Sequence, residues 1–392
     1  MQQLAHSAHA TPVALTAFVV AALLAGAPST QDDAASLDRV VLAGISAGVY
    51  PGAVLVVGTR DSILVAKGYG HFTWSTRSQV PSPDSTLYDL ASLTKVVATT
   101  PAAMLLVDRG RLRLDAPVQT YLPAFTGPGK EAVTVRDLLS HQSGLRPSLR
   151  LDSLTRDAAS AKQRVFDEPL RWAPHTRTEY SDLNAMLLGW VIEAVSGEPL
   201  DRFVADSVFQ PLGLASTLFR PARNLRPRMV PVSLWHGTAI AGEVHDQNAA
   251  RLGGVSGHAG LYATASDLAR YARWYLNHGR TASGVQLVAP RTMETFISRV
   301  AGDRALGWET KDPRSTDNAG SRMSPATFGH TGFTGTSLWI DPQRGVFVVL
   351  LTNRVFAPHT RTSLSQLKQI RGRAADAAVA LLCDRPHGSP TC

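Results

Sequence analysis

The sequence predicts an α+β fold of the α/β sandwich type, an antiparallel sheet flanked by N- and C-terminal helices with a largely helical inserted region. Turn-bounded stretches of alternating or β-branched residues occupy both ends of the chain, whereas apolar residues in the middle recur at helical spacing. Strands from the two ends can pair only within one sheet, so we expect the middle to be an insertion. The chain of 392 residues, 44% hydrophobic and 18% charged, is long enough for an ample core.

The N-terminal part predicts a helix followed by a β-hairpin. Apolar residues between Leu37 and Ile45 have helical spacing. After the turn at residues 50–52 (Tyr-Pro-Gly), residues 53–59 and 62–69 form two β-branched stretches. We therefore expect the hairpin to supply one side of the sheet.

The middle of the chain predicts helices, and the C-terminal third returns to strands. The helices are expected over residues 89–108, 133–139, 182–195, 199–209 and 266–277. The last of them is expected to have Ser266 as its N-cap and Gly279 beyond its end. Strands are expected over residues 306–310, 327–331, 336–340 and 346–352, with a closing helix over 364–382.

Residues 1–30 predict a secretory signal. They contain no Lys, Arg, Asp or Glu, and an apolar run from Val13 ends in the small residues Ala-Gly-Ala at 25–27. The prediction is therefore export, either to the periplasm or out of the cell. Because the segment before the run also lacks Lys and Arg, an uncleaved N-terminal anchor is the alternative, although about 15 apolar residues is short for a membrane span.

A single domain is predicted over residues 37–383, followed by a tail at 384–392. It divides into a sheet part at about 37–80 and 300–383 and a helical part at about 81–299. The chain has two cysteines, Cys383 and Cys392. In an oxidising compartment they can close a short C-terminal loop, and two free thiols are the alternative.

The formal net charge of +8 does not predict a nucleic-acid binder. The basic residues are spread along the chain without a long Lys/Arg run, and no reading motif is present. We expect a solvated basic surface that supports at most weak association with an anionic envelope. The sequence leaves the oligomeric state open.

The tetrapeptide Ser92-Leu93-Thr94-Lys95 is the first candidate for chemistry. Serine is a weak nucleophile until a neighbouring group takes its proton, and a lysine one helical turn later lies within reach. The chain has six lysines against 33 arginines, and arginine cannot give up its proton. The same spacing recurs at Ser365 and Lys368, so this motif alone does not decide the function.

Two further motifs supply the context that the tetrapeptide lacks. Tyr180-Ser181-Asp182 precedes a predicted helix, and residues 330–335 (HTGFTG) join two predicted strands. With these motifs, in this order, the chain resembles the serine β-lactamase and penicillin-binding-protein superfamily. It is most similar to the class C-like branch, which also holds DD-peptidases, D-aminopeptidases and esterases. The stretches 133–144 and 242–260 also look like the family, and the resemblance covers roughly residues 37–382.

The resemblance implies a β-lactamase/transpeptidase-like fold and a role for each motif. It implies that Ser92 attacks a carbonyl to form an acyl-enzyme, while Lys95 and Tyr180 share the removal and return of its proton. The backbone N–H groups of Ser92 and Phe333 are the implied oxyanion hole. The implied substrate-binding residues are Asp182, His330, Thr331, Gly332 and Phe333. Glycine at position 332 lets the strand approach the substrate closely, and no cofactor is implied.

Two departures from the family pattern bear on the substrate. Asp182 stands where the family has a substrate-binding asparagine, and an ionised carboxylate cannot donate a hydrogen bond. If it lies close to Lys95 it favours the charged lysine, which shifts the proton-acceptor role toward Tyr180. His330 stands where many members have lysine and attracts a carboxylate less strongly. We therefore expect small esters or peptides ending in D-amino acids, with a class C-like β-lactamase as one alternative and a sensor or scaffold that is acylated without turnover as another.

Two other patterns suggest different chemistry. Residues 44–48 match Gly-x-Ser-x-Gly, the nucleophile elbow of α/β-hydrolases, but here a predicted helix precedes and a strand follows, the reverse of what the elbow needs. His245, Asp246 and His258 could suggest a metal site, but their spacing fits no standard zinc pattern. We expect neither an elbow nor a metal.

Overall fold

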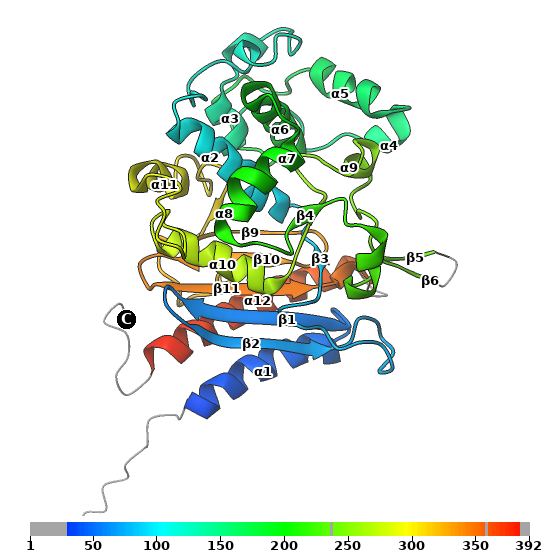
Figure 1. The fold of residues 1–392 in the computed structure, drawn as a ribbon, viewed down its shortest axis with the longest axis vertical. Helices are drawn as coiled ribbons and strands as arrows, with labels where there is room; N and C mark the ends of the chain where they lie inside the picture. The colour runs from blue at the N-terminus through cyan, green and yellow to red at the C-terminus, as the bar shows by residue number, and fades with distance from the viewer. Residues whose placement is uncertain (1–29, 236–237, 357–359, 385–392) are drawn as a thin grey trace, which may run out of the picture.

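A six-stranded antiparallel sheet forms the base of the molecule (Figure 1). The computed structural model describes residues 30–235, 238–356 and 360–384. The strand order is β2-β1-β11-β10-β9-β8, so the first and last strands of the sequence are neighbours in the interior of the sheet. The strands are β1 (Gly52–Thr59), β2 (Ile63–Gly70), β8 (Glu309–Thr310), β9 (Phe328–Thr331), β10 (Ser337–Asp341) and β11 (Val346–Thr352). The predicted fold class, with strands from both chain ends in one sheet, is confirmed.

Helices cover both faces of this sheet, which explains why β11 is buried throughout and β1 is buried up to its last residue. On one face α1 (Thr30–Ser46) and α12 (Thr360–Cys383) lie side by side, as Figure 1 shows. Side chains alternate along a strand, so Leu55 of β1 joins the core beneath these two helices while Val54 joins the core on the opposite face. There α10 (Ala265–Leu276) packs on β1 and β11.

The helical region stands above this second face. Its helices are α2 (Thr100–Asp108), α3 (Val135–Ser140), α4 (Leu151–Leu154), α5 (Ala158–Asp167), α6 (Asp182–Ser196), α7 (Leu200–Val204), α8 (Gln210–Leu212), α9 (Gln247–Arg251) and α11 (Pro290–Ile297). It also holds short strands that the sequence does not predict. They are β3 (Tyr88–Asp89), β4 (Leu218–Phe219), β5 (Ser233–Trp235), β6 (Thr238–Ile240) and β7 (Leu261–Ala263), and they form the small sheets β3-β7-β4 and β5-β6.

The helix predicted over residues 89–108 begins later than expected. Asp89 belongs to β3, where it pairs with Tyr262, so the helix cannot begin there. Residues 95–99 then form a π-helical turn directly before α2. Pro101 near the start of α2 has no N–H to donate to the preceding turn, which accounts for the interrupted α-helical ladder.

Two smaller predictions are wrong in detail. The N-cap of α10 is Thr264, whose hydroxyl accepts a hydrogen bond from the Asp267 N–H at 3.3 Å. Ser266 instead donates to Asp84, at 2.5 Å. The strand expected over 306–310 shrinks to its last two residues, because Leu306 and Gly307 turn away to bond Phe296 and Leu139.

The Gly-x-Ser-x-Gly pattern at 44–48 lies at the end of α1 and is followed by a turn and β1. The order is helix then strand, so the nucleophile elbow is excluded here. A small residue is needed at 44 because a Cβ there would lie 2.2 Å from the Tyr50 hydroxyl oxygen, which donates to the Val41 carbonyl at 2.9 Å. This pattern therefore reflects packing at a helix end.

The chain ends bear on the predicted export. The leader lies outside the described residues except for Thr30, which begins α1. Among the helices that are described, none is both long and apolar enough to cross a membrane. Cys383 is disulfide-bonded, and Cys392, the other cysteine of the chain, lies outside the described residues.

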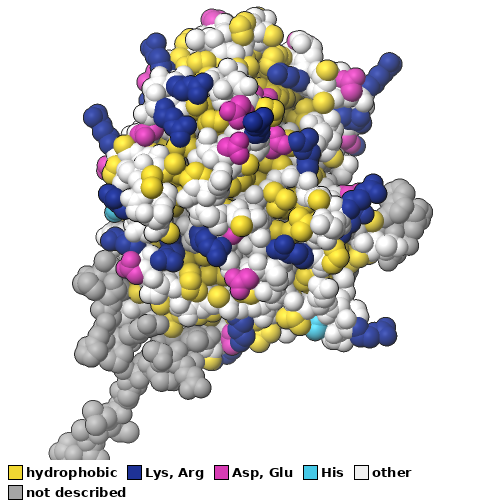
Figure 2. All heavy atoms as spheres, viewed as in Figure 1, with side chains coloured by type: hydrophobic (Ala, Val, Ile, Leu, Met, Phe, Trp, Pro, Cys, Tyr) yellow, Lys and Arg dark blue, Asp and Glu magenta, His cyan; other side chains and the backbone are white. Residues whose placement is uncertain are grey.

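Figure 2 shows one face of the molecule, on which Lys and Arg side chains are scattered among Asp and Glu rather than gathered into one patch.

Candidate active site

Ser92 lies in the short connection between β3 and the helix that contains Lys95. Ala91 before it has a φ of 45°, an uncommon left-handed conformation for a residue with a Cβ. The buried Asp89 side chain holds this conformation, because its Oδ1 accepts the Ala91 N–H at 2.8 Å. Its Oδ2 accepts the His245 N–H, also at 2.8 Å. Asp89 therefore fixes the backbone that presents Ser92.

The structure brings the three predicted catalytic side chains into direct contact. The Lys95 Nζ lies 3.0 Å and the Tyr180 hydroxyl oxygen 2.9 Å from the Ser92 Oγ, and both groups donate to it. The twin motif has no such setting, since Ser365 is exposed on α12. In this resting arrangement the Ser92 Oγ accepts two hydrogen bonds. Lys95 or Tyr180 must therefore lose a proton before that residue can take the proton of the serine.

Lys95 is buried, and three polar groups surround its ammonium. Besides the hydrogen bond to Ser92, it donates to the His258 backbone carbonyl at 3.1 Å. It also forms an ion pair with the Asp182 Oδ1 at 2.8 Å. Burial lowers the pKa of Lys95, but the Asp182 carboxylate and Tyr180 outweigh that effect and hold the pKa above its ordinary value. Asp182 therefore lies close to Lys95 and favours the charged form of the lysine, which is the effect that the sequence predicts for a nearby aspartate.

Tyr180 lies between two neutral imidazoles. Burial raises the pKa of Tyr180, and the Lys95 charge offsets only part of that rise, so the resting phenol keeps its proton. The ring centroid of His141 lies 4.8 Å from that of Tyr180, and the His330 ring lies 5.9 Å away. Burial and then the positive charge of Arg304 hold the pKa of His141 well below its usual range. Its Nδ1 accepts the Ser181 N–H at 3.2 Å, which fixes the ring against Tyr180.

His330 lies in strand β9, one residue before its end. Its Nδ1 donates to the Thr331 carbonyl at 2.8 Å, which leaves Nε2 as the acceptor nitrogen. Burial, followed by the charge of Lys95, holds the pKa of His330 well below its usual range. The ring is therefore neutral, and it supplies no charge to attract a substrate carboxylate.

The turn after β9 packs on the backbone that leads to Ser92. A Cβ on Gly332 would lie 2.1 Å from the Thr336 Oγ1 and 2.4 Å from the Leu90 carbonyl oxygen, so only glycine fits. The Thr336 hydroxyl also donates to the Leu90 carbonyl, at 3.0 Å. Within the described part of the chain, neither the Ser92 nor the Phe333 N–H donates a hydrogen bond. This is the arrangement that an oxyanion hole requires.

The sequence gives no signal for one basic group at this site. The Arg304 guanidinium lies 5.4 Å from the centre of the Tyr180 ring, and its side chain is only 13% exposed. Its nearest acid is Asp303, at 3.3 Å. Arg304 is one of 33 arginines without a motif around it, and only the fold places it beside His330 and Tyr180.

The three residues considered for a metal separate in the structure. The His245 ring faces Phe333, with centroids 5.5 Å apart, whereas His258 and Asp246 contact each other. No group of three or more His, Cys, Asp or Glu among the described residues could hold a metal ion. Of the residues found around Ser92, His141, Asp246 and His258 lie in the stretches 133–144 and 242–260 that look like the family, whereas Asp89 and Arg304 had no signal in the sequence.

Known proteins resemble this chain in both sequence and fold. The profile of the family described as "Beta-lactamase" matches residues 37–371. An Escherichia coli protein named "Putative D-alanyl-D-alanine carboxypeptidase" is 32% identical over 359 residues, which cover 82% of each chain. A protein of the same name from Salmonella schwarzengrund is 30% identical and covers 90% of each.

Solved structures show the same fold at lower identity. A penicillin-binding-protein homologue from Caulobacter crescentus aligns with a TM-score of 0.72 and 22% identity, covering 90% of this chain and 98% of its own. EstCE1, described as a hydrolase with promiscuous acyltransferase activity, aligns with a TM-score of 0.69 and 22% identity, covering 88% and 99%. The sequence match across most of the chain, together with the Ser92, Tyr180 and His330 motifs in one site, shows that the chain belongs to the Beta-lactamase family.

Proposed function

We propose that this protein is an exported serine hydrolase that acts through an acyl-enzyme on peptides ending in D-amino acids, of the kind found in peptidoglycan. The observation that carries this proposal is the Ser92 Oγ within 3.0 Å of the Lys95 Nζ and 2.9 Å of the Tyr180 hydroxyl. A nucleophile in contact with two proton carriers is what acyl transfer by a serine requires. The nucleophile and the proton carriers are all side chains, so the proposal needs no cofactor.

The proton count defines the active form. At rest Lys95 is charged and Tyr180 is neutral, so the active enzyme has one proton fewer on this coupled pair. In that form Tyr180 takes the Ser92 proton while the charged Lys95 stabilises it, and the Ser92 Oγ bonds to the substrate carbonyl carbon. The developing oxyanion is received by the N–H groups of Ser92 and Phe333. The leaving amine takes the proton from Tyr180, and water then releases the acyl group.

Arg304 supports a substrate with a carboxylate. His330 is neutral and cannot replace the lysine that many family members use, but the Arg304 guanidinium lies beside the same Tyr180 ring. A guanidinium binds a carboxylate through paired hydrogen bonds. The relatives named D-alanyl-D-alanine carboxypeptidase, at 30–32% identity, point to the same class of substrate.

Small esters are the second candidate class. The neutral His330 puts no charge where the family lysine stands, which favours uncharged substrates and makes efficient penicillin hydrolysis the weaker alternative. A sensor that is acylated without turnover would use the same Ser92 contacts, so it must be separated by experiment.

A substrate panel tests the proposed chemistry. We expect turnover of D-Ala-D-Ala peptides and p-nitrophenyl esters, with little turnover of nitrocefin. Ser92→Ala should lose all of this activity, while Ser365→Ala, which alters the twin motif, should keep it. Activity that persists in Ser92→Ala would refute the assignment, and labelling of Ser92 by a fluorophosphonate without turnover would show a sensor instead.

The same panel tests the role of Arg304. Arg304→Ala should raise the KM for the D-Ala-D-Ala peptide about 10- to 100-fold, the range expected when a charge-assisted hydrogen bond is lost. The kinetics of the neutral ester should stay close to wild type. Equal losses on both substrates would argue against a carboxylate-binding role.

A further inference from the structure

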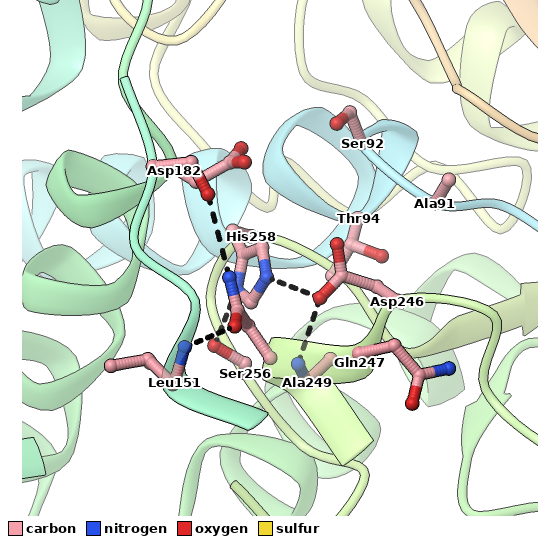
Figure 3. Close-up of polar contacts among 12 residues, drawn as sticks. Ala91, Ser92, Thr94, Leu151, Asp182, Asp246, Gln247, Ala249, Ser256 and His258 are labelled. Atoms are coloured by element: carbon pink, nitrogen blue, oxygen red, sulfur yellow. Dashed lines mark hydrogen bonds and ion pairs between the residues drawn. The ribbon is translucent and has the colours of Figure 1, made fainter. Parts of the chain in front are cut away.

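Ser256, His258 and Asp246 form a Ser-His-Asp cluster (Figure 3). Ser256 and His258 are buried, whereas the Asp246 side chain is 32% exposed. The His258 Nε2 is 3.0 Å from the Asp246 Oδ1, and its Nδ1 is 2.7 Å from the Ser256 Oγ. The His258 residue is only 1% exposed. Burial would raise the pKa of Asp246, but the contact with His258 outweighs it and lowers that pKa, so the carboxylate stays charged.

This cluster is not a second catalytic triad. Ser256 is 6% exposed and His258 is covered, so no substrate carbonyl can reach the Ser256 Oγ. What the cluster does touch is the proposed reaction centre, because the backbone carbonyl of His258 accepts a hydrogen bond from the Lys95 Nζ at 3.1 Å.

The segment containing His258 is tied to the Ser92 helix on both sides of that carbonyl. The Gly257 carbonyl accepts from the Thr99 hydroxyl at 2.7 Å, and the Leu261 N–H donates to the Thr94 Oγ1 at 3.2 Å. A Cβ on Gly257 would lie 2.0 Å from the Ala185 carbonyl oxygen of α6, so the segment is wedged between the two helices. The His258 ring is the side-chain anchor in the middle of this segment.

Asp246 connects that anchor to a second element. The same Oδ1 that contacts His258 accepts the Ala249 N–H at 2.8 Å and thereby caps α9. In turn, the Asn248 side chain of α9 accepts the Leu151 N–H at 2.9 Å, which fixes α9 to the start of α4. Helix α9 and its cap Asp246 therefore fix the His258 ring, and the His258 ring fixes the backbone carbonyl of the same residue.

We infer that Asp246 and His258 are positioning residues for Lys95, which fix the His258 carbonyl so that the Lys95 Nζ stays within hydrogen-bond distance of Ser92. This inference rests on the proposed serine chemistry. Without the carbonyl, the ammonium keeps its contacts with Ser92, Asp182 and the Tyr180 ring, and the ion pair with Asp182 draws it away from the serine. The carbonyl also favours the charged form of Lys95, since it accepts a hydrogen bond from the ammonium.

The expected signature is therefore a fall in kcat together with a moved pH profile. Loss of the carbonyl contact lowers the pKa of Lys95, so the rising limb of the rate profile shifts to lower pH. The ionisable groups that face Lys95 or lie near it are Asp182, Tyr180, His141, His330, Asp246 and Arg304. None of these six side chains is substituted in the His258 variants. The His258 ring is itself an ionisable group in contact with Asp246, so His258→Gln, which removes the ring but keeps a donor toward Asp246, separates the loss of the ring from the loss of the carbonyl contact.

Four variants test this, measured with a p-nitrophenyl ester over a range of pH. His258→Ala should lower kcat about 100-fold, as expected for a catalytic group misplaced by about 1 Å, with little change in KM. His258→Gln keeps a donor toward Asp246 and should recover most of the loss. Asp246→Ala should lower kcat, while Asp157→Ala, which removes the N-cap of α5 away from the site, should not.

Several results would overturn the inference. One is wild-type kcat in both His258→Ala and Asp246→Ala. Another is a fall in kcat that matches the fall in the fraction of folded protein, with a pH–rate profile that does not shift. Should His258→Ala not fold, the comparison of Asp246→Ala with Asp157→Ala decides. Labelling of Ser256 by a fluorophosphonate in Ser92→Ala would mean the cluster is a second nucleophilic site. If wild type itself turns over no ester or peptide, the proposed function fails rather than the positioning role.

Discussion

At the scale of single residues, the feature that sets this candidate site apart is the aspartate paired with Lys95. Asp182 lies 2.8 Å from the Lys95 Nζ, where the family pattern has asparagine. Its negative charge acts to raise the pKa of both Lys95 and Tyr180. Both groups therefore retain protons at neutral pH, and the enzyme should become active only as one proton leaves the pair.

This predicts a specific change in Asp182→Asn. Removing the charge lowers the pKa values of both partners, so the form with one proton fewer appears at lower pH. The rising limb of kcat/KM should move down by about 1–3 pH units, the usual effect of one nearby opposite charge. The measurement is the pH–rate profile with a neutral ester, and a profile that stays in place would contradict this account of Asp182.

At the scale of elements, the site depends on a two-residue strand. The carboxylate of Asp89 in β3 accepts N–H groups from Ala91 and His245, and its backbone carbonyl accepts the Thr334 hydroxyl at 2.7 Å. Three segments distant in sequence thus meet at one buried residue. Burial outweighs the two N–H contacts and raises the pKa of Asp89 to about 6, with the charge of Asp246 adding to the rise.

That raised pKa predicts how the stability of this junction varies with pH. The folded state binds a proton on Asp89 more tightly than the unfolded state, whose pKa is the ordinary 3.8. The free energy of unfolding should therefore fall as pH rises from about 4 to about 6, by at most about 3 kcal/mol. Urea unfolding of wild type and Asp89→Asn across this range isolates the effect as a difference. A difference that does not vary with pH would argue against it.

The elements show what could be predicted from the sequence and what could not. Runs such as β1 and β11 carry strong local patterns, so their existence and their meeting in one sheet were predictable. Strand β3 is too short to have a pattern and exists only because β7 pairs with it. The site divides in the same way. Ser92, Tyr180 and His330 belong to motifs, whereas Arg304 and Asp89 are isolated residues that the fold brings together.

At the scale of the whole molecule, the predicted export remains to be tested. Residues 1–30 carry no charged side chain, and their apolar run ends in Ala-Gly-Ala. The mature protein should therefore begin close to Pro28, just ahead of α1. N-terminal sequencing of protein recovered from the periplasm or medium checks this, and a start at Met1 would favour the uncleaved anchor.

The strand order has a consequence for when the molecule can first act. β1 emerges early in synthesis, but its partner β11 is made near the end of the chain, so these two neighbouring strands can pair only late. Such distant pairings fold slowly and leave a strand edge open meanwhile. The turn that packs on Leu90 behind Ser92 belongs to the same late part of the chain. An incompletely synthesised chain would therefore contain Ser92 without the turn and the sheet that complete its surroundings, so we expect the proposed activity only after the sheet has formed.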